Sequence, residues 1–342
     1  MTASVLRVLV AMLGVLLLVS GGSSLFAAEA VLETVRGQVD FVPPASEAQV
    51  PPPYRLTAAK FAYELTPQPT VSQSFELFTL TFPSPLVTPE ANNNTVHCEF
   101  FRAKGAGKRP AVVMLHILGG DFPLSRLFCR SLASHGVSAL FVKMPYYGPR
   151  RQPGSTARMV SMDPEQTVRG MTQAVLDVRR AAAWLAAQSD IDGEQLGIMG
   201  ISLGGITGAL AATAEPRFQK VCLLLAGGDI GQVAWNAKEL AALRKTWTAR
   251  GGTQESLVEL LKPVDPVTYG ELVRGRSILM LNASHDEVIP KACTESLWKA
   301  FGKPEIVWWD AGHYTAARFI FEGLARATRF FAGEASVAAE AE

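Results

Sequence analysis

Three side chains in the second half of the chain have the types of a nucleophile, an acid and a base. Ser202 lies in the run GISLG, Asp286 in SHDEVIP and His313 in DAGH. A serine hydroxyl is a poor nucleophile until an imidazole removes its proton, and the imidazole needs a carboxylate that fixes its tautomer. The three residue types together therefore indicate acyl-transfer chemistry.

The spacing G-x-S-x-G around Ser202 is typical of a sharp turn between a strand and a helix. The flanking glycines are needed because the turn is strained and a side chain there would collide with the adjacent strand and helix. At ordinary glycine and serine usage this spacing arises by chance in about one chain in ten. The order along the chain, serine then acid then histidine, makes a catalytic interpretation of the motif much more specific.

Short apolar runs separated by long amphipathic segments follow residue 110, as parallel βαβ units require. We expect an α/β fold with a mostly parallel, doubly wound sheet and helices on both faces. The expected strands are 111–115, 138–144, 196–200, 221–227, 277–283 and 305–309, and the expected helices are near 124–135, 164–189, 203–214, 291–301 and 314–331. Since Ser202, Asp286 and His313 each follow a strand, they should meet at one sheet edge.

The run HILGG at residues 116–120 follows the expected strand 111–115. This loop, the elbow, the acid and the histidine together resemble the α/β-hydrolase superfamily, nearest its dienelactone-hydrolase and acetyl-esterase-like branch, over about residues 75–331. The resemblance implies an α/β-hydrolase fold, with the backbone N–H groups of Leu203 and Leu118 as oxyanion-hole donors. Dienelactone hydrolases use a cysteine nucleophile, so Ser202 shifts the expectation toward an esterase.

One position departs from the family pattern. The family loop usually reads His-Gly, whereas Ile117 stands here in place of the glycine. A β-branched residue restricts the backbone, which leaves the second donor open. We expect His116 to brace this loop rather than to act as a base.

The acid has two candidates, Asp286 and its neighbour Glu287. Asp286 comes first after the strand, matches a D-x-x-V-P-like pattern and has less rotamer freedom to lose than a glutamate. We therefore assign the acid to Asp286. Taken singly, Asp286 could instead be a turn or N-cap residue, and His313 a histidine at a helix start.

The N-terminal residues differ in composition from the rest of the chain. Arg7 is the only charge before Glu29, and residues 8–19 are apolar or glycine. Residues 1–30 are therefore expected to be a signal peptide of a secreted or periplasmic protein, with small residues at a cleavage point. The alternative is an uncleaved anchor, which alone would involve a membrane.

We divide the remaining chain by pattern. Residues 31–89 are proline-rich and predict extended segments and loops, a linker leading into edge strands, with residues 75–82 and 95–102 as an antiparallel hairpin. Residues 90–335 form the expected catalytic domain, and residues 336–342 a disordered tail. The stretch 229–273 is too long for a plain crossover, so we expect a helical cap with pieces near 234–250 and 254–261.

Composition narrows the function classes. The net charge is +1 and no lysine or arginine run stands out, which disfavours nucleic acid as a partner. Four cysteines without C-x-x-C spacing predict no metal site, and the chemistry calls for no cofactor. The expected partner is a small-molecule ester, and the oligomeric state stays open.

Two rival functions remain on the same fold. One is a serine peptidase of the prolyl-oligopeptidase type, although residues 31–89 are too few for the propeller that such enzymes carry. The other is a non-catalytic binding protein. The loop after the strand 138–144 could line the pocket or face solvent: Tyr146 or Tyr147 could contact the substrate, and Arg150 and Arg151 could equally pair with acidic surface groups. Trp235 and Trp247 could form an apolar wall of the pocket or pack helices.

Export gives the first testable prediction. If residues 1–30 are a signal peptide, the mature protein from its native host begins at Val31 or Ala28. N-terminal sequencing of the purified protein measures this. A soluble cytoplasmic species that begins at Met1 or Thr2 would contradict the prediction.

Overall fold

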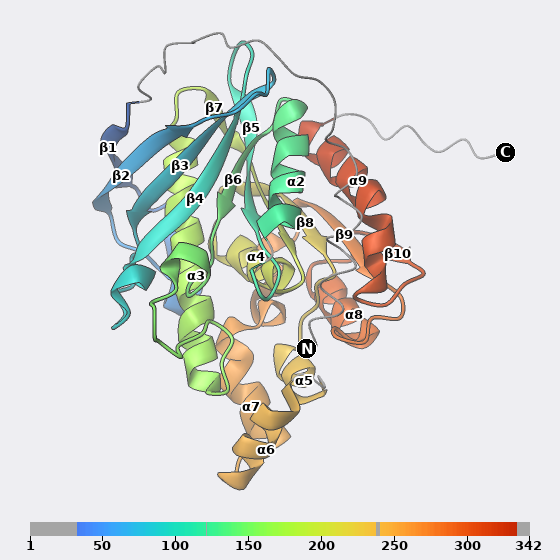
Figure 1. The fold of residues 1–342 in the computed structure, drawn as a ribbon. Coiled ribbons are helices and arrows are strands. Elements are labelled where there is room, and N and C mark those ends of the chain that lie inside the picture. Colours follow the sequence, from blue (N-terminus) through green and yellow to red (C-terminus); the bar gives the residue numbers. More distant parts are fainter. Residues whose placement is uncertain (1–32, 121, 237–239, 334–342) are drawn as a thin grey trace, which may run out of the picture. The chain divides into compact units, whose positions relative to one another are not determined.

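The computed structural model describes residues 33–120, 122–236 and 240–333. The expected signal peptide and the expected tail lie outside these residues. The described part of the chain contains no helix that is long and apolar enough to cross a membrane. It forms a ten-stranded sheet with helices on both faces (Figure 1).

The sheet is antiparallel at one side and parallel through the rest. Its order is β1-β2-β3-β4-β6-β5-β7-β8-β9-β10, and all pairs from β6 onward in this order are parallel. The expected α/β-hydrolase architecture and all six parallel strands are thereby confirmed. The strand bounds are β1 Val35–Phe41, β2 Ala59–Gln68, β3 Phe75–Pro83, β4 Thr95–Ala103, β5 Arg109–Leu115, β6 Ser138–Val142, β7 Ile191–Ile201, β8 Phe218–Leu224, β9 Ser277–Ala283 and β10 Glu305–Trp309.

Two hydrophobic cores lie on opposite faces of the sheet. Helices α2 (Phe122–Ser134) and α9 (Ile320–Ala332) cover one face, and α3 (Pro164–Ala186), α4 (Leu203–Ala214) and α8 (Lys291–Ala300) cover the other (Figure 1). All side chains of β6 and all residues of α4 are buried. Central parallel strands covered on both faces need such continuous apolar runs.

The 3₁₀ helices are short and lie mainly in the connections between the larger elements. Their bounds are Glu47–Gln49, Pro52–Tyr54, Ala91–Asn94, Gly148–Arg150, Lys262–Val264, Pro266–Val273 and Thr315–Phe319.

The proline-rich N-terminal segment belongs to the sheet, which corrects its interpretation as a linker. β1 pairs with β2 and β2 with β3, both antiparallel. The expected hairpin of β3 and β4 is confirmed, so the sheet runs without a break across the predicted boundary at residue 89. Only two of the seven residues of β1 are buried, which explains why its apolar pattern was too weak to predict a strand.

An ion pair fixes this segment against the main core. Arg179 on α3 has a fully buried side chain, and its Nη2 lies 2.5 Å from Oε2 of Glu47. The same guanidinium lies 3.4 Å from the buried carboxylate of Glu215 and packs over the ring of Phe41. Because a buried guanidinium needs compensating charge and acceptors, Glu47 ties the loop between β1 and β2 to α3.

The segment expected to form the cap is helical. It contains α5 (Ile230–Asn236), α6 (Ala241–Ala249) and α7 (Gln254–Leu261), and α6 and α7 are separated at Gly251 and Gly252 as predicted. The three helices leave the sheet beyond β8 (Figure 1). Trp235 and Trp247 are half-buried against the larger core, so they pack the helices.

A single carboxylate holds the two ends of this helical segment. Asp265 accepts the N–H of Ile230 at 2.8 Å, at the start of α5, and the N–H of Val267 at 3.0 Å. Burial raises the pKa of Asp265 to about 6. The start and the end of the segment therefore share one buried anchor.

The contact between Arg179 and Glu47 predicts that loss of the Glu47 carboxylate strongly lowers the stability of the fold. Glu47→Ala removes the carboxylate nearest to a buried guanidinium and should lower the free energy of unfolding by roughly 2–4 kcal/mol. Denaturant-induced unfolding of the purified protein measures this. The matched control is Glu64→Ala, because Glu64 and Arg36 form an exposed pair and its loss should change stability by less than about 1 kcal/mol. Equal effects of the two changes would contradict the assignment.

Candidate active site

Ser202 occupies the turn between β7 and α4 in a left-handed conformation. Its φ and ψ are 54° and −116°, which is an unfavourable region for a residue with a side chain. The N–H of Ser202 donates to the carbonyl of Leu224 at 2.9 Å, and its carbonyl accepts the N–H of Ile206. The backbone on both sides of the serine is thus fixed by the sheet and by α4.

The glycines of the GISLG run are required by close backbone contacts. A Cβ on Gly200 would lie 2.0 Å from the carbonyl oxygen of Gly204, and a Cβ on Gly204 would lie 2.4 Å from that of Leu115. Both obstacles are main chain and cannot rotate away. The sequence prediction that these glycines have a steric role is confirmed.

His313 lies within hydrogen-bond distance of both other residues singled out in the sequence. Ser202 Oγ is 3.0 Å from His313 Nε2, and His313 Nδ1 is 2.8 Å from Asp286 Oδ2. A carboxylate only accepts, so Nδ1 carries the proton and Nε2 accepts from the serine hydroxyl. The arrangement can pass a proton from Ser202 to His313 and stabilise the resulting imidazolium.

Asp286 is held in place by its own turn. Its Oδ1 accepts the N–H groups of Val288 at 2.9 Å and Ile289 at 2.7 Å, which leaves Oδ2 for the imidazole. The side chains of Asp286 and His313 are 4% and 10% exposed, so little solvent competes for their contact. The turn role that the sequence left as an alternative and the contact with His313 coexist in one carboxylate.

The acid turn and the histidine turn lie side by side because the pairing of β9 and β10 continues beyond both strands. The N–H of Ser284 donates to the carbonyl of Trp309 at 2.8 Å, and that of His285 to the carbonyl of Ala311 at 2.9 Å. Glu287 does not reach the imidazole, but its Oε2 accepts the backbone N–H of His313 at 2.8 Å. Sequence reasoning missed this contact, since it weighed Glu287 only as a rival to Asp286.

The HILGG loop forms a tight turn after β5. The N–H of Gly120 donates to the carbonyl of Ile117 at 3.2 Å, and Gly119 has a φ of 90°. The left-handed residues are thus Gly119 and Gly120, while Ile117 keeps a negative φ. This explains how a β-branched residue is tolerated where the family has a glycine. Leu118 lies within this turn and Leu203 is the first residue of α4.

His116 braces the loop, as expected. Its Nδ1 donates to the carbonyl of Ile117 at 2.8 Å, its Nε2 accepts the N–H of Met144 at 3.1 Å, and its ring centroid lies 4.6 Å from that of Tyr147. Burial lowers the pKa of His116 to about 4. The imidazole is therefore neutral near pH 7 and joins the loops that follow β5 and β6.

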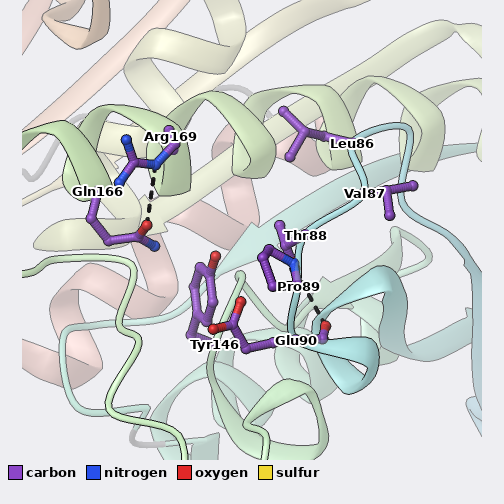
Figure 2. Close-up of a pocket in the computed structure, with 8 residues that line it drawn as sticks. All are labelled: Leu86, Val87, Thr88, Pro89, Glu90, Tyr146, Gln166 and Arg169. Atoms are coloured by element: carbon purple, nitrogen blue, oxygen red, sulfur yellow. Dashed lines mark hydrogen bonds between the residues drawn. The ribbon is translucent and has the colours of Figure 1, made fainter.

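A pocket lies beside the loop that follows β6. It has a volume of about 250 Å³, and Tyr146 lines it together with Gln166 and Arg169 of α3 and with residues 86–90. Figure 2 shows the Tyr146 ring between the side chains of Gln166 and Glu90. Ser202, Asp286 and His313 are not among its lining residues, so this pocket does not test whether Tyr146 contacts the substrate. The ring of Tyr147 packs on His116.

Arg150 does not pair with surface acids, which was one of the two alternatives for this residue; it pairs with a buried one. Its side chain and that of Asp177 are both fully buried, with 2.8 Å between Nη1 and Oδ2. Asn93 accepts the N–H of Tyr146 at 2.9 Å through its side chain, and the carbonyl of Asn93 accepts from Arg150 at 2.7 Å. This buried network holds Tyr146 at a φ of 67°.

The cysteines lie away from this chemistry. Cys98, Cys129, Cys222 and Cys293 are buried free thiols. Within residues 33–120, 122–236 and 240–333, no three histidine, cysteine, aspartate or glutamate side chains gather as ligands for a metal ion.

The close approach at Gly204 generates a prediction about the elbow. Gly204→Ala should displace Leu115 or Ser202 and lower hydrolysis of an ester by at least about a hundredfold, since small misplacements of reacting groups are costly. Ester hydrolysis and a crystal structure of the variant measure the effect. Gly107→Ala is the control, because a Cβ there meets no atom within 4 Å although its φ is also positive. An active Gly204→Ala enzyme with an unshifted elbow would contradict the prediction.

Two family models match parts of the chain. Residues 81–231 match the family model described as alpha/beta hydrolase domain containing 18, and residues 170–333 match that of the prolyl oligopeptidase family. Uncharacterised proteins from two Mycobacterium tuberculosis strains are 28% identical over 211 residues, which are 60% of this chain. The chain spans about half the length of these curated relatives, 50% in each case.

Solved structures share the fold. An acetyl xylan esterase from a Paenibacillus species aligns with a TM-score of 0.61 and 19% identity, over 78% of this chain and 88% of that one. An acetyl xylan esterase from a Thermoanaerobacterium species aligns with a TM-score of 0.58 and 19% identity, over 76% and 87%. These structures show the fold alone. The two family matches, which together cover residues 81–333, agree with the elbow and the sheet order and identify the chain as a member of the α/β-hydrolase superfamily.

Proposed function

We propose that this protein is a serine esterase that cleaves a carboxylic ester through an acyl-enzyme. The observation that carries the proposal is the continuous contact from Ser202 Oγ to His313 Nε2, at 3.0 Å, and from His313 Nδ1 to Asp286 Oδ2, at 2.8 Å. Nucleophile, base and orienting acid are within hydrogen-bond distance in the order that such chemistry requires.

In the first half of the reaction, Ser202 Oγ attacks the ester carbonyl carbon while its proton moves to His313 Nε2. Asp286 stabilises the imidazolium and keeps the proton on Nδ1. The tetrahedral intermediate then collapses, and His313 gives its proton to the leaving alcohol. The acyl group remains as an ester on Ser202.

In the second half, water takes the place of the alcohol. His313 removes a proton from the water, the resulting hydroxide attacks the acyl carbonyl, and the proton returns to Ser202 as the carboxylic acid leaves. The nucleophilic attacks and proton transfers use these side chains and water, and the proposal assigns no metal or cofactor to them.

The negative charge on the carbonyl oxygen needs donors in both tetrahedral intermediates. We assign them to the N–H groups of Leu203 and Leu118. Leu203 begins α4, where N–H groups lack acceptors within the helix and the helix dipole is positive. Leu118 lies in the turn that His116 braces, so its backbone is held before substrate binds.

A peptide bond is the second candidate. The match of residues 170–333 to the prolyl oligopeptidase family supports it, because serine peptidases of that family use the same types of side chain. We favour the ester because of the esterase-like branch that the motifs resemble. The acetyl xylan esterases of similar fold make acetylated sugars one class for the substrate panel.

Two further parts of the proposal concern the choice of substrate and the compartment in which the enzyme works. We propose that the segment with α5, α6 and α7 acts as a cap that selects among acyl and alcohol groups, since insertions beyond the carboxyl ends of parallel strands lie where ligands bind. We also propose that the enzyme works outside the cytoplasm, from the apolar run near Arg7.

Kinetics of single variants test the mechanism. Ser202→Ala should lower kcat by about 10⁴-fold or more, and Asp286→Asn by roughly 10³- to 10⁴-fold because it favours the wrong tautomer. The measurements are hydrolysis of a panel of acyl esters, acetylated sugars and prolyl amides, and covalent labelling with a fluorophosphonate. Ser202→Ala should retain native stability, because its side chain points away from the core.

The panel also separates the rival functions. Faster cleavage of the amides than of every ester would make the protein a peptidase. No turnover and no fluorophosphonate labelling of the wild type would leave a binding protein on a hydrolase fold. A Ser202→Ala variant with more than a tenth of wild-type activity would remove Ser202 as the nucleophile.

A further inference from the structure

We infer that Glu287 is a positioning residue that holds the backbone of His313 for catalysis. The inference rests on the proposed esterase function. Asp286 and Glu287 are consecutive, yet their carboxylates contact different atoms of one histidine: Asp286 Oδ2 the imidazole Nδ1 at 2.8 Å, and Glu287 Oε2 the main-chain N–H at 2.8 Å.

The two contacts control different movements of His313. The Asp286 contact sets the tautomer and the rotation of the ring about its side-chain bonds. The Glu287 contact restrains the Cα position, which the ring contact alone leaves free to shift along the loop. Since Ser202 Oγ and Nε2 are 3.0 Å apart, a shift of about 1 Å in the loop would break that hydrogen bond.

Glu287 is not needed to satisfy a buried group. Both Glu287 and the contact with His313 are exposed, so water can replace the carboxylate at the N–H of His313. Its loss should therefore leave the fold intact while the histidine becomes less well placed. This separates a positioning role from a structural one.

A substitution at Gly312 provides a second, independent way to disrupt the contact between Glu287 and His313. A Cβ on Gly312 would lie 2.4 Å from Glu287 Oε2, while the nearest backbone atom, the carbonyl oxygen of His285, would be at 3.4 Å. The φ of Gly312 is not positive, so an alanine there is not strained by its conformation. The added methyl group would displace the Glu287 carboxylate and little else.

Asp310 provides the matched control. It is an exposed carboxylate in the same turn, and its Oδ1 contacts the ring of His285 at 3.0 Å. Removing it takes one negative charge from the neighbourhood of His313 without touching the main-chain contact. Asp310→Ala should keep kcat within about twofold of the wild type.

The experiment compares the wild type with five variants: Glu287→Ala, Glu287→Gln, Gly312→Ala, the double variant Glu287→Ala/Gly312→Ala and the control Asp310→Ala. Glu287→Ala should lower kcat roughly tenfold with KM unchanged, and Glu287→Gln should stay within about threefold because its amide oxygen still accepts. Gly312→Ala should lose as much as Glu287→Ala, and the double variant no more than either, since both act on one contact. The rate of fluorophosphonate labelling of Ser202 should fall in parallel.

Several outcomes would overturn the inference. These are a Glu287→Ala enzyme with unchanged kcat, an equal loss in Glu287→Gln, an equal loss in Asp310→Ala, and multiplied losses in the double variant. Failure of the proposed function is recognised separately, because the wild type would then neither label nor hydrolyse any ester. If Glu287→Ala does not fold, Gly312→Ala beside Glu287→Gln decides the question.

Discussion

The left-handed backbone at Ser202 is the constraint on which the remaining structure depends. A conformation with φ of 54° in a residue with a side chain costs about 1–3 kcal/mol and persists only where its surroundings fix it. Here the surroundings are the hydrogen bond to Leu224 on β8 and the close passage of Gly204 past Leu115 on β5. Three neighbouring strands and one buried helix must therefore be in place before the serine can be.

The same requirement explains why α4 contains only small, apolar and uncharged residues. It has buried residues on every side and consists of alanine, glycine, leucine, isoleucine and threonine, because larger or charged residues would not fit between the sheet and the helices that cover it. The polar groups of the site come from loops at the sheet edge, and the scaffold beneath them is apolar. Apolar packing fixes the scaffold beneath the site, and hydrogen-bonded turns fix the polar side chains above it.

Buried polar contacts hold the loops around this scaffold. His116 links the loops after β5 and β6 through a neutral ring with one donor and one acceptor. The fully buried pair of Arg150 and Asp177 supports the loop that carries Tyr146, and Arg179 ties the N-terminal strands to α3. Such pairs add little net stability compared with apolar packing, but breaking one leaves an uncompensated charge, so they favour a single arrangement of the loops.

The sequence by itself determined the parallel core and the elbow, and it singled out the three candidate residues that the structure brings into contact. Central strands are continuous apolar runs, helices have a clear period, and the glycines at 200 and 204 have a local steric cause, so each leaves a mark within a few residues. Even the preference for Asp286 over Glu287 followed from its place after the strand, and the structure puts Asp286 at the imidazole.

Only the tertiary structure decided what depends on partners far apart in the chain. β1 is an edge strand, β2 is its neighbour, and both have few buried residues, so their membership in the sheet shows only in their pairing. An arginine is expected at the surface, and only the structure shows that Arg150 is buried in an ion pair with Asp177 on another element. The contact of Glu287 with the backbone of His313 joins two turns that β9 and β10 bring together. Because every residue except proline has a main-chain N–H, the sequence carries no signal for such a contact.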